Sequence, residues 1–232
     1  MRRRAGPLRA VVLAGLAALP ASAGEEVWRP CPGGGWWTAG ADPTEHGLVC
    51  KGVAAAFELL SGCGVEVTEA GRVRLVDALP VFCDSAAYGM FDAGAGEIRL
   101  GRPALCRDTA PAGSIFQSLP TEAAFTALAA HEAAHALLFA VGLGAERRLE
   151  HEYIAGVVQH AALGPAHRAA ALEATGVIAP ASEAEFNPFL LSMAPASYAA
   201  KAWLDFDARP DGCALLRAFA TGAARLPELP DL

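Results

Sequence analysis

The sequence predicts an α+β fold, in which a small antiparallel or mixed sheet is followed by a helical half. Three observations lead to this prediction. Short segments with strand character occur between residues 65 and 100. After Pro111 the chain takes on helical character, and alanine, which favours helices, is abundant among the 53% of hydrophobic residues. Six cysteines in 232 residues indicate that disulfides stabilise the fold.

The N-terminus has the pattern of a signal peptide. Four arginines precede an apolar run over Ala10–Leu19, and Ala21-Ser22-Ala23 is a cleavage signal of the A-x-A type. An uncleaved membrane anchor is the alternative, but the run is much shorter than the roughly 20 residues that span a bilayer. We therefore expect residues 1–23 to be removed and the protein to be exported, either periplasmic or secreted, with no integral membrane segment after cleavage.

The expected mature chain is strongly acidic. The whole sequence has a net charge of −7, and removing the four arginines of the signal peptide leaves 14 basic residues against 25 acidic ones, a net charge of −11. A surface of this charge argues against nucleic acid and anionic lipid as partners.

The mature chain, residues 24–232, is expected to form a single domain with a strand-rich half over 24–115 and a helical half over 116–232. The first half begins with an irregular stretch to about Gly47, followed by a short helix from Leu48 to Ser61. Strands are expected at 65–68, 72–76, 88–91 and 97–100. The last two flank residues 92–96, which have the composition of a hairpin loop.

The first helix of the second half is expected to have Ser118 or Thr121 as its N-cap and to run to about Val141, before Gly142 and Gly144. Further helices are expected at 149–163, 166–175, 197–204 and 213–220.

The cysteines have the distribution of structural disulfides. All six lie after the expected cleavage site, at Cys31, Cys50, Cys63, Cys83, Cys106 and Cys213. No C-x-x-C pair occurs among them, which weakens the interpretation as a zinc ribbon or a thiol redox site. We expect few or no free thiols, with the bridges concentrated in the N-terminal half because it holds five of the six.

The stretch AAHEAAHALLF, residues 129–139, contains three polar side chains in an otherwise apolar helix. His131 and His135 stand at i and i+4, so both can face one metal ion, and Glu132 lies beside them. This is the H-E-x-x-H pattern of zinc hydrolases, in which the metal lowers the pKa of its water and the glutamate removes the proton. A solvated helix face is the alternative, but the apolar neighbours leave little polar surface for it to join.

A catalytic zinc usually has three protein ligands and a water molecule, so a third ligand is required. The metzincin continuation is absent because Leu138 and Val141 occupy its glycine and histidine positions. The next helix offers Glu150, His151 and Glu152 in succession, and only one can face the metal because successive helical residues point about 100° apart.

We favour Glu152 as the third ligand. It shares a face with Ala155 and Gly156, whose small side chains would allow close packing against the first helix. Glu150 lines up with Ile154 and Val157, and both it and His151 remain alternatives.

At this point the chain resembles the gluzincin metallopeptidases, whose zincin-type fold carries H-E-x-x-H on one helix and a glutamate ligand on a following helix. Residues 152–155, Glu-Tyr-Ile-Ala, are similar to the E-G-x-A element that supplies that glutamate. The hairpin over 88–100 is similar to the edge strand that holds an extended substrate in this family. The resemblance covers about residues 88–159, and it departs where some members have a supporting aspartate, because this chain has Gly156 there.

The residues and the resemblance together predict an exported zinc metallopeptidase acting on a peptide or protein substrate. His131, His135 and Glu152 would bind Zn²⁺, and Glu132 would be the general base. The alternative is a catalytically silent zincin-like scaffold that binds metal or peptide. The presence of Glu132 favours the enzyme. Tyr153 and Tyr198 could donate a hydrogen bond to a tetrahedral intermediate. We expect instead that both are buried, with their hydroxyls hydrogen-bonded within the protein.

Overall fold

The computed structural model describes residues 26–68, 70–78, 81–82, 85–111, 113–180 and 182–227. The expected signal peptide, residues 1–23, and Cys83 lie outside the described residues.

The described chain has the predicted α+β architecture, with a mixed five-stranded sheet in strand order β1-β2-β3-β7-β6. Strands β2, β3 and β7 run parallel, whereas β1 and β6 pair antiparallel at the two edges. The strands are β1 (Arg29–Pro30), β2 (Trp36–Ala39), β3 (Gly71–Val76), β6 (Gly89–Asp92) and β7 (Glu97–Gly101), and a separate short ladder joins β4 (Val81–Phe82) to β5 (Ser85–Ala86). The predicted hairpin is confirmed, since β6 and β7 flank the turn after Asp92.

Helix α1 (Pro43–Gly62) is the crossover that the parallel pairing of β2 and β3 requires. It begins five residues before the expected Leu48 because Asp42 and Glu45 form a capping box, in which each carboxylate accepts a backbone N–H at the other residue. Gly52 lets α1 approach the next long helix closely, because a Cβ there would lie 2.5 Å from the carbonyl oxygen of Thr126.

The N-terminal region differs from expectation in two places. The stretch expected to be irregular contains β1 and β2, and the expected strand at 65–68 is absent. Strand β3 already has neighbours on both sides, β2 and β7, so no position beside it remains for residues 65–68. Val65 instead continues the end of α1, with its amide donating to the carbonyl of Leu60.

The second half is helical, as predicted, and most of its helices end within a few residues of the expected bounds. These helices are α3 (Ile115–Ser118), α4 (Thr121–Ala140), α5 (Arg148–Ala162), α6 (Pro165–Thr175), α7 (Pro188–Met193), α8 (Pro195–Ala208) and α9 (Gly212–Ala220), preceded by α2 (Pro103–Thr109) and with a 3₁₀ turn at Glu183–Glu185. Neither Ser118 nor Thr121 is the N-cap of α4, because that position is Pro120, which has no side-chain cap.

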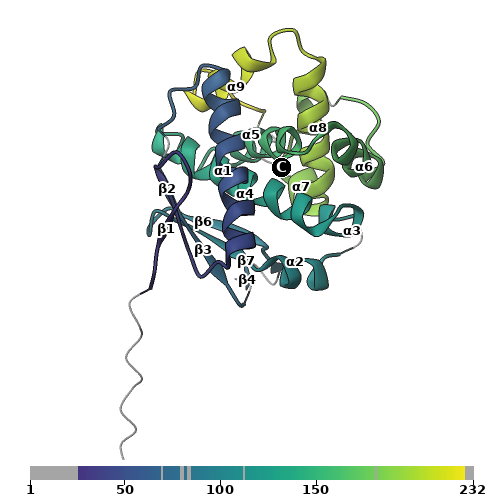
Figure 1. Ribbon diagram of the computed structural model, residues 1–232. Coiled ribbons are helices and arrows are strands. Elements are labelled where there is room, and N and C mark those ends of the chain that lie inside the picture. Colours follow the sequence, from purple (N-terminus) through teal and green to yellow (C-terminus); the bar gives the residue numbers. More distant parts are fainter. Residues whose placement is uncertain are drawn as a thin grey trace, which may run out of the picture.

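Helix α4 is the centre of the packing. Figure 1 shows the strands at the lower left, α1 crossing in front, and α6 and α8 on the right. Helix α4 packs against α1, α5 and the β6–β7 hairpin, and one cluster of buried apolar residues spans both halves of the described chain. By length and composition α4 could cross a bilayer, but most of its apolar stretch is buried inside the protein, as in a core helix.

Two disulfides are present among the described residues. Cys31–Cys50 links the loop between β1 and β2 to α1, and Cys63–Cys213 links the end of α1 to α9. The first bridge lies within the N-terminal half, where the bridges were expected to be concentrated, and the second joins that half to the helical half. Cys106 is the free cysteine among the described residues, which is compatible with the expectation of few or no free thiols. It is buried on α2 with its thiol donating to the carbonyl of Gly101, the last residue of β7, and burial raises the pKa of the thiol to about 12.

The two bridges are expected to differ in their effect on stability. Cys63–Cys213 closes a sequence separation of 150 residues and Cys31–Cys50 one of 19, so the longer loop restricts the unfolded chain more. In the chain-entropy model this difference is about 2 kcal/mol. We expect C63S/C213S to lower the free energy of unfolding by about that much more than C31S/C50S, measured by denaturant titration. An equal loss in both variants would contradict this account.

Candidate metal centre

Helix α4 brings the two predicted histidine ligands together. The Nε2 atoms of His131 and His135 lie 3.1 Å apart, and the two side chains are 17% and 16% exposed. Glu132, one residue along the same helix, is only 6% exposed. The i and i+4 spacing therefore places both imidazole edges at one point, as the sequence predicted.

Helix α5 brings Glu152 to the same point. Its carboxylate oxygens lie 3.5 Å from Nε2 of His131 and 3.9 Å from Nε2 of His135, and one donor atom from each of the three residues lies within 4.8 Å of the others. Two ligand atoms about 2.0–2.1 Å from a tetrahedral zinc ion are about 3.3 Å apart. The spacing and chemistry of the His131, His135 and Glu152 donors therefore fit a zinc site.

The structure separates Glu152 from the two alternatives on α5. Glu150 is buried against Arg147, whose guanidinium lies 3.0 Å from its carboxylate, and it also accepts the amide of Leu226 at 2.8 Å. Its role is to hold the chain after α9 against α5. His151 lies behind His135, so it contacts a metal-ligand candidate without facing the same point.

A chain of hydrogen bonds sets the proton positions on both histidines. Nε2 of His151 lies 3.1 Å from the carbonyl oxygen of Leu143, which can only accept, so this nitrogen carries the proton. Nδ1 of His151 is then an acceptor, and Nδ1 of His135, 3.4 Å away, donates to it. Nε2 of His135 is therefore left with its lone pair directed at the candidate metal position.

Gln159 does the same for His131. The side-chain oxygen of Gln159 lies 3.0 Å from Nδ1 of His131, so this nitrogen donates, and in the neutral ring Nε2 has the lone pair. Metal-binding histidines usually donate their other N–H to such a partner. The sequence had left this support unassigned, and the structure gives Gln159 and His151 as the acceptors of the two Nδ1 protons.

We did not predict from the sequence that Gln159 and His151 accept hydrogen bonds from the two histidines. Gln159 lies seven residues after Glu152, two helical turns along the same face, and this spacing was the available signal. His151 had been considered only as a competing ligand. Its position behind His135 depends on the loop at Leu143, which periodicity does not predict.

The imidazoles and the carboxylate of the cluster shift one another's pKa values. Burial disfavours the carboxylate of Glu152, but its hydrogen bond with His131 and the neighbouring imidazoles outweigh burial and hold its pKa at about 2. Burial lowers the pKa of His135 to about 3. Burial also opposes protonation of His131, yet contact with Glu152 raises its pKa. A bound cation would neutralise the negative charge of the half-buried Glu152 carboxylate, which faces the two imidazoles.

Glu132 lies between the cluster and the edge strand β6. A Cβ at Gly89 would lie 2.6 Å from Cγ of Glu132, so only glycine allows the strand to approach this closely. Burial raises the pKa of Glu132 to about 7. The predicted edge strand therefore lies directly against the predicted general base.

An open cleft leads to these residues. It has a volume of about 920 Å³, and its lining includes Tyr88, Gly89, His131, Glu132 and Glu152, together with residues of α6 and of the α7–α8 connection. The cleft is large enough for part of a peptide.

Three other residues singled out in the sequence have structural roles. Tyr153 donates to Asp205 at 2.6 Å and Tyr198 donates to the carbonyl of Leu149 at 2.8 Å, so both hydroxyls are satisfied as expected. Gly156 does allow close helix packing, but its partner is α8, where a Cβ would lie 2.8 Å from Cα of Ala199. The expectation that Gly156 packs against α4 is therefore wrong.

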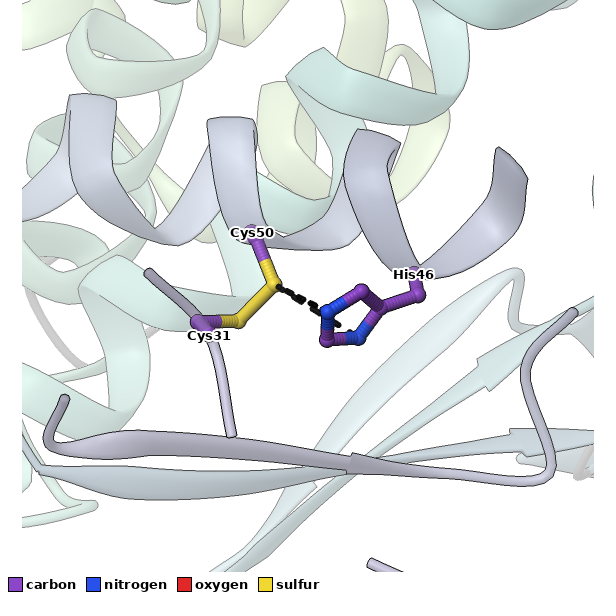
Figure 2. A group of neighbouring side chains, drawn as sticks. All are labelled: Cys31, His46 and Cys50. Carbon is purple, nitrogen blue, oxygen red and sulfur yellow. Dashed lines mark hydrogen bonds between the residues drawn. A yellow bond between two sulfur atoms is a disulfide. The ribbon is translucent and has the colours of Figure 1, made fainter. Parts of the chain in front are cut away.

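A second group with metal-ligand chemistry contains Cys31, His46 and Cys50. Figure 2 shows the two sulfurs bonded to each other, with the edge of the His46 ring directed at Cys50. Nδ1 of His46 also lies 2.7 Å from Oγ1 of Thr38. Because a metal site needs thiolates and both sulfurs are in the disulfide, this group is structural.

Comparison with protein families gives one match. A family described as a family of unknown function, DUF6639, matches residues 37–228, which include every residue of the candidate metal centre. Neither the curated proteins nor the solved structures give a match.

The two acidic residues of α5 give a direct test of the ligand assignment. Glu152→Gln is expected to lose zinc because it removes the carboxylate that, among the described residues, converges with the two histidines. Glu150→Gln is expected to keep zinc but to lose about 3–5 kcal/mol of unfolding free energy, because Arg147 is left as a buried unpaired charge. Metal analysis and denaturant titration of both variants check this. Zinc loss in Glu150→Gln alone would reverse the assignment.

Proposed function

We propose that this chain, which belongs to the DUF6639 family of unknown function, is a zinc-dependent metallopeptidase of gluzincin type that is exported to the periplasm or secreted. The observation that carries the proposal is the convergence of His131, His135 and Glu152 on one point, with the carboxylate of Glu132 beside it at the wall of an open cleft.

The three ligand residues would hold the metal in a defined orientation. When bound, zinc supplies a Lewis acid that polarises a carbonyl group and a water molecule. His131 and His135 present lone pairs on Nε2 because Gln159 and His151 accept their Nδ1 protons. Glu152 contributes a negative charge, and its low pKa keeps it ionised at neutral pH.

Glu132 would move the proton. Its carboxylate borders the cleft, and it is not needed as a ligand because three donors already converge beside it. A carboxylate with a pKa near neutral can accept a proton from water and then donate it to the leaving nitrogen of the peptide.

The edge strand supports a peptide as the substrate. Strand β6 pairs with β7 on one side and ends the described sheet, so its other edge can pair with an extended chain. Gly89 places this strand against Glu132. A peptide added to β6 would therefore pass the general base. The acidic surface favours peptide or protein substrates over nucleic acid.

Export is supported by two independent features. The N-terminal sequence has the signal-peptide pattern, and the two disulfides fit an oxidising compartment.

The first test of the proposal is the exchange of Glu132→Gln. This amide keeps the size of the side chain and leaves the three ligands in place, but it cannot accept the water's proton. Positioned acid–base catalysis contributes about 10²–10⁴-fold, so turnover of a peptide library is expected to fall at least a hundredfold. Zinc content and thermal unfolding should match the wild type.

The alternative, a silent zincin-like scaffold, has a different signature. In that case the wild-type protein binds zinc but cleaves no member of a broad peptide library, and Glu132→Gln binds peptides as the wild type does. A wild-type protein that is free of zinc after purification in zinc-containing buffer would contradict the enzyme and the metal-binding form of the scaffold, and would leave only a peptide-binding scaffold.

A second prediction concerns the residues that orient the histidines. Loss of such a partner typically weakens metal affinity about 10–100-fold. We expect His151→Phe and Gln159→Leu to lose zinc affinity by this factor, measured by competition with a chelator. Gln159→Glu keeps an acceptor for His131 and should retain most of the affinity. His167→Phe, an exposed histidine on α6, is the control. Unchanged affinity in both test variants would show that the two contacts do not orient the ligands.

A further inference from the structure

Phe139 is a large apolar side chain that lies exposed beside the candidate metal centre. It follows His131 and His135 at i, i+4 and i+8, so the three side chains share one face of α4. Phe139 is 41% exposed, although most apolar residues of α4 are buried. A single apolar residue on a surface needs no explanation by itself, but this one extends the row of candidate ligands by one helical turn.

Phe91 of the edge strand β6 contacts the Phe139 ring. The two ring centres are 5.6 Å apart and the ring planes are inclined by 59°, an offset arrangement that aromatic pairs favour. Phe91 and Gly89 are two residues apart on β6, so both lie on the face of the strand that approaches α4. Gly89 lies against Glu132, and the next position on this face is the aromatic pair of Phe91 and Phe139.

The hydrogen bonding of β6 determines which of its backbone groups a peptide can reach. The amide of Gly101 donates to the carbonyl of Tyr88 at 2.8 Å, and hydrogen-bonded residue pairs alternate along an antiparallel ladder. Gly89 and Phe91 therefore direct their N–H and C=O groups away from β7. Because the amide of Phe91 meets the carboxylate of Glu132, an extended peptide can pair with Gly89 and with the carbonyl of Phe91.

A peptide paired in this way has alternate side chains on the face that approaches α4. Residues side by side on neighbouring strands have their side chains on the same face. The peptide side chain beside Gly89 therefore faces Glu132, and the one beside Phe91 faces the aromatic pair. When a strand is added to a sheet edge, pockets for alternate side chains give the specificity. The two rings have no hydrogen-bonding group, so a polar side chain would lose its hydrogen bonds with water there.

Arg148 also lies at this end of the site. It is the first residue of α5, is exposed, and lies one turn before Glu152 on the same helix face. Its charge would repel a cationic peptide side chain. An acidic side chain that reached Arg148 would be the alternative to an apolar one on the aromatic pair, and the experiment below distinguishes them.

We infer that Phe91 and Phe139 form an apolar subsite, which binds an aromatic or aliphatic side chain of the peptide at the position beside Phe91. Removing the exposed surface of Phe139 from water would favour this binding. The inference rests on the proposed function for the identity of the ligand as a peptide, but it does not depend on turnover.

The experiment measures binding without cleavage. The mature chain carrying Glu132→Gln is loaded with zinc and exposed to short peptides, capped at both ends, in which one position at a time is varied over all residues. At one position we expect phenylalanine and leucine to bind at least about tenfold more tightly than alanine. Lysine, aspartate and glutamate at that position should bind no better than alanine.

Phe139→Ala, added to the same protein, is expected to lower the phenylalanine-to-alanine ratio at that position at least about threefold, because the aromatic contact is lost. Phe139→Trp keeps an aromatic ring and should retain most of the ratio. Trp37→Ala is the matched control, because Trp37 is 43% exposed and lies on β2, which β3 and β7 separate from β6. Zinc content and thermal unfolding show whether each variant is folded. If Phe139→Ala is unfolded, Phe139→Gln, which also removes the ring, provides the comparison.

Four results would overturn the inference: no apolar preference at any position, the same preference in a folded variant without the Phe139 ring, a preference for acidic residues at the position that responds to Phe139, or no peptide binding at all. An unchanged preference would place the apolar contact elsewhere, on the cleft wall that includes Met193.

The peptidase proposal is judged separately, by metal content and by cleavage of the library by the chain with native Glu132. Cleavage without an apolar preference would support the enzyme and contradict the subsite. An apolar preference that depends on Phe139, without cleavage, would support the subsite and contradict the enzyme.

Discussion

The pairing of α4 with α5 is the constraint on which the rest of the site depends. Helix α4 is buried at the centre of the protein and carries two imidazoles and a carboxylate, which would destabilise the fold if they had no partners. Helix α5 supplies those partners, since Glu152 faces both imidazoles, Gln159 accepts from His131, and His151 accepts from His135. The same contacts that make burial tolerable also leave the two Nε2 lone pairs free for a metal.

Helix α5 presents Glu152, Gln159 and His151 to α4 because contacts outside the cluster fix its orientation. Glu150 is held by Arg147 and Leu226, Tyr153 donates to Asp205, and Gly156 packs against α8. These contacts set the rotation of the helix about its axis. A rotation of about 100°, one residue, would exchange Glu152 for a neighbour. The candidate for the third ligand is therefore selected by packing on the sides of α5 that do not face the cluster.

Because the rotation of α5 depends on tertiary contacts, only part of the fold and of the candidate site could be predicted from the sequence. The α+β order, the hairpin and the long helices follow from local pattern, and the spacing of His131 and His135 places them together on any helix. Three features needed tertiary information. Strand β2 was hidden in a stretch without periodicity, the partner of Cys63 lay 150 residues away, and Gln159 became visible only once α5 was docked on α4.

The candidate site contains residues from both halves of the chain. The H-E-x-x-H helix alone would therefore not reproduce the surroundings of Glu132. Strand β6 belongs to the sheet, yet Gly89 brings its backbone against Glu132, on the helical half. This close approach removes water from the carboxylate, and that loss of solvation is the main cause of its raised pKa. The contact between Gly89 and Glu132 thus does two things. It places the strand that could hold a peptide beside Glu132, and it raises the pKa of the residue that could transfer a proton. A sheet displaced from α4 would leave Glu132 solvated, with the ordinary pKa of a surface glutamate and a weaker affinity for the proton that it must accept.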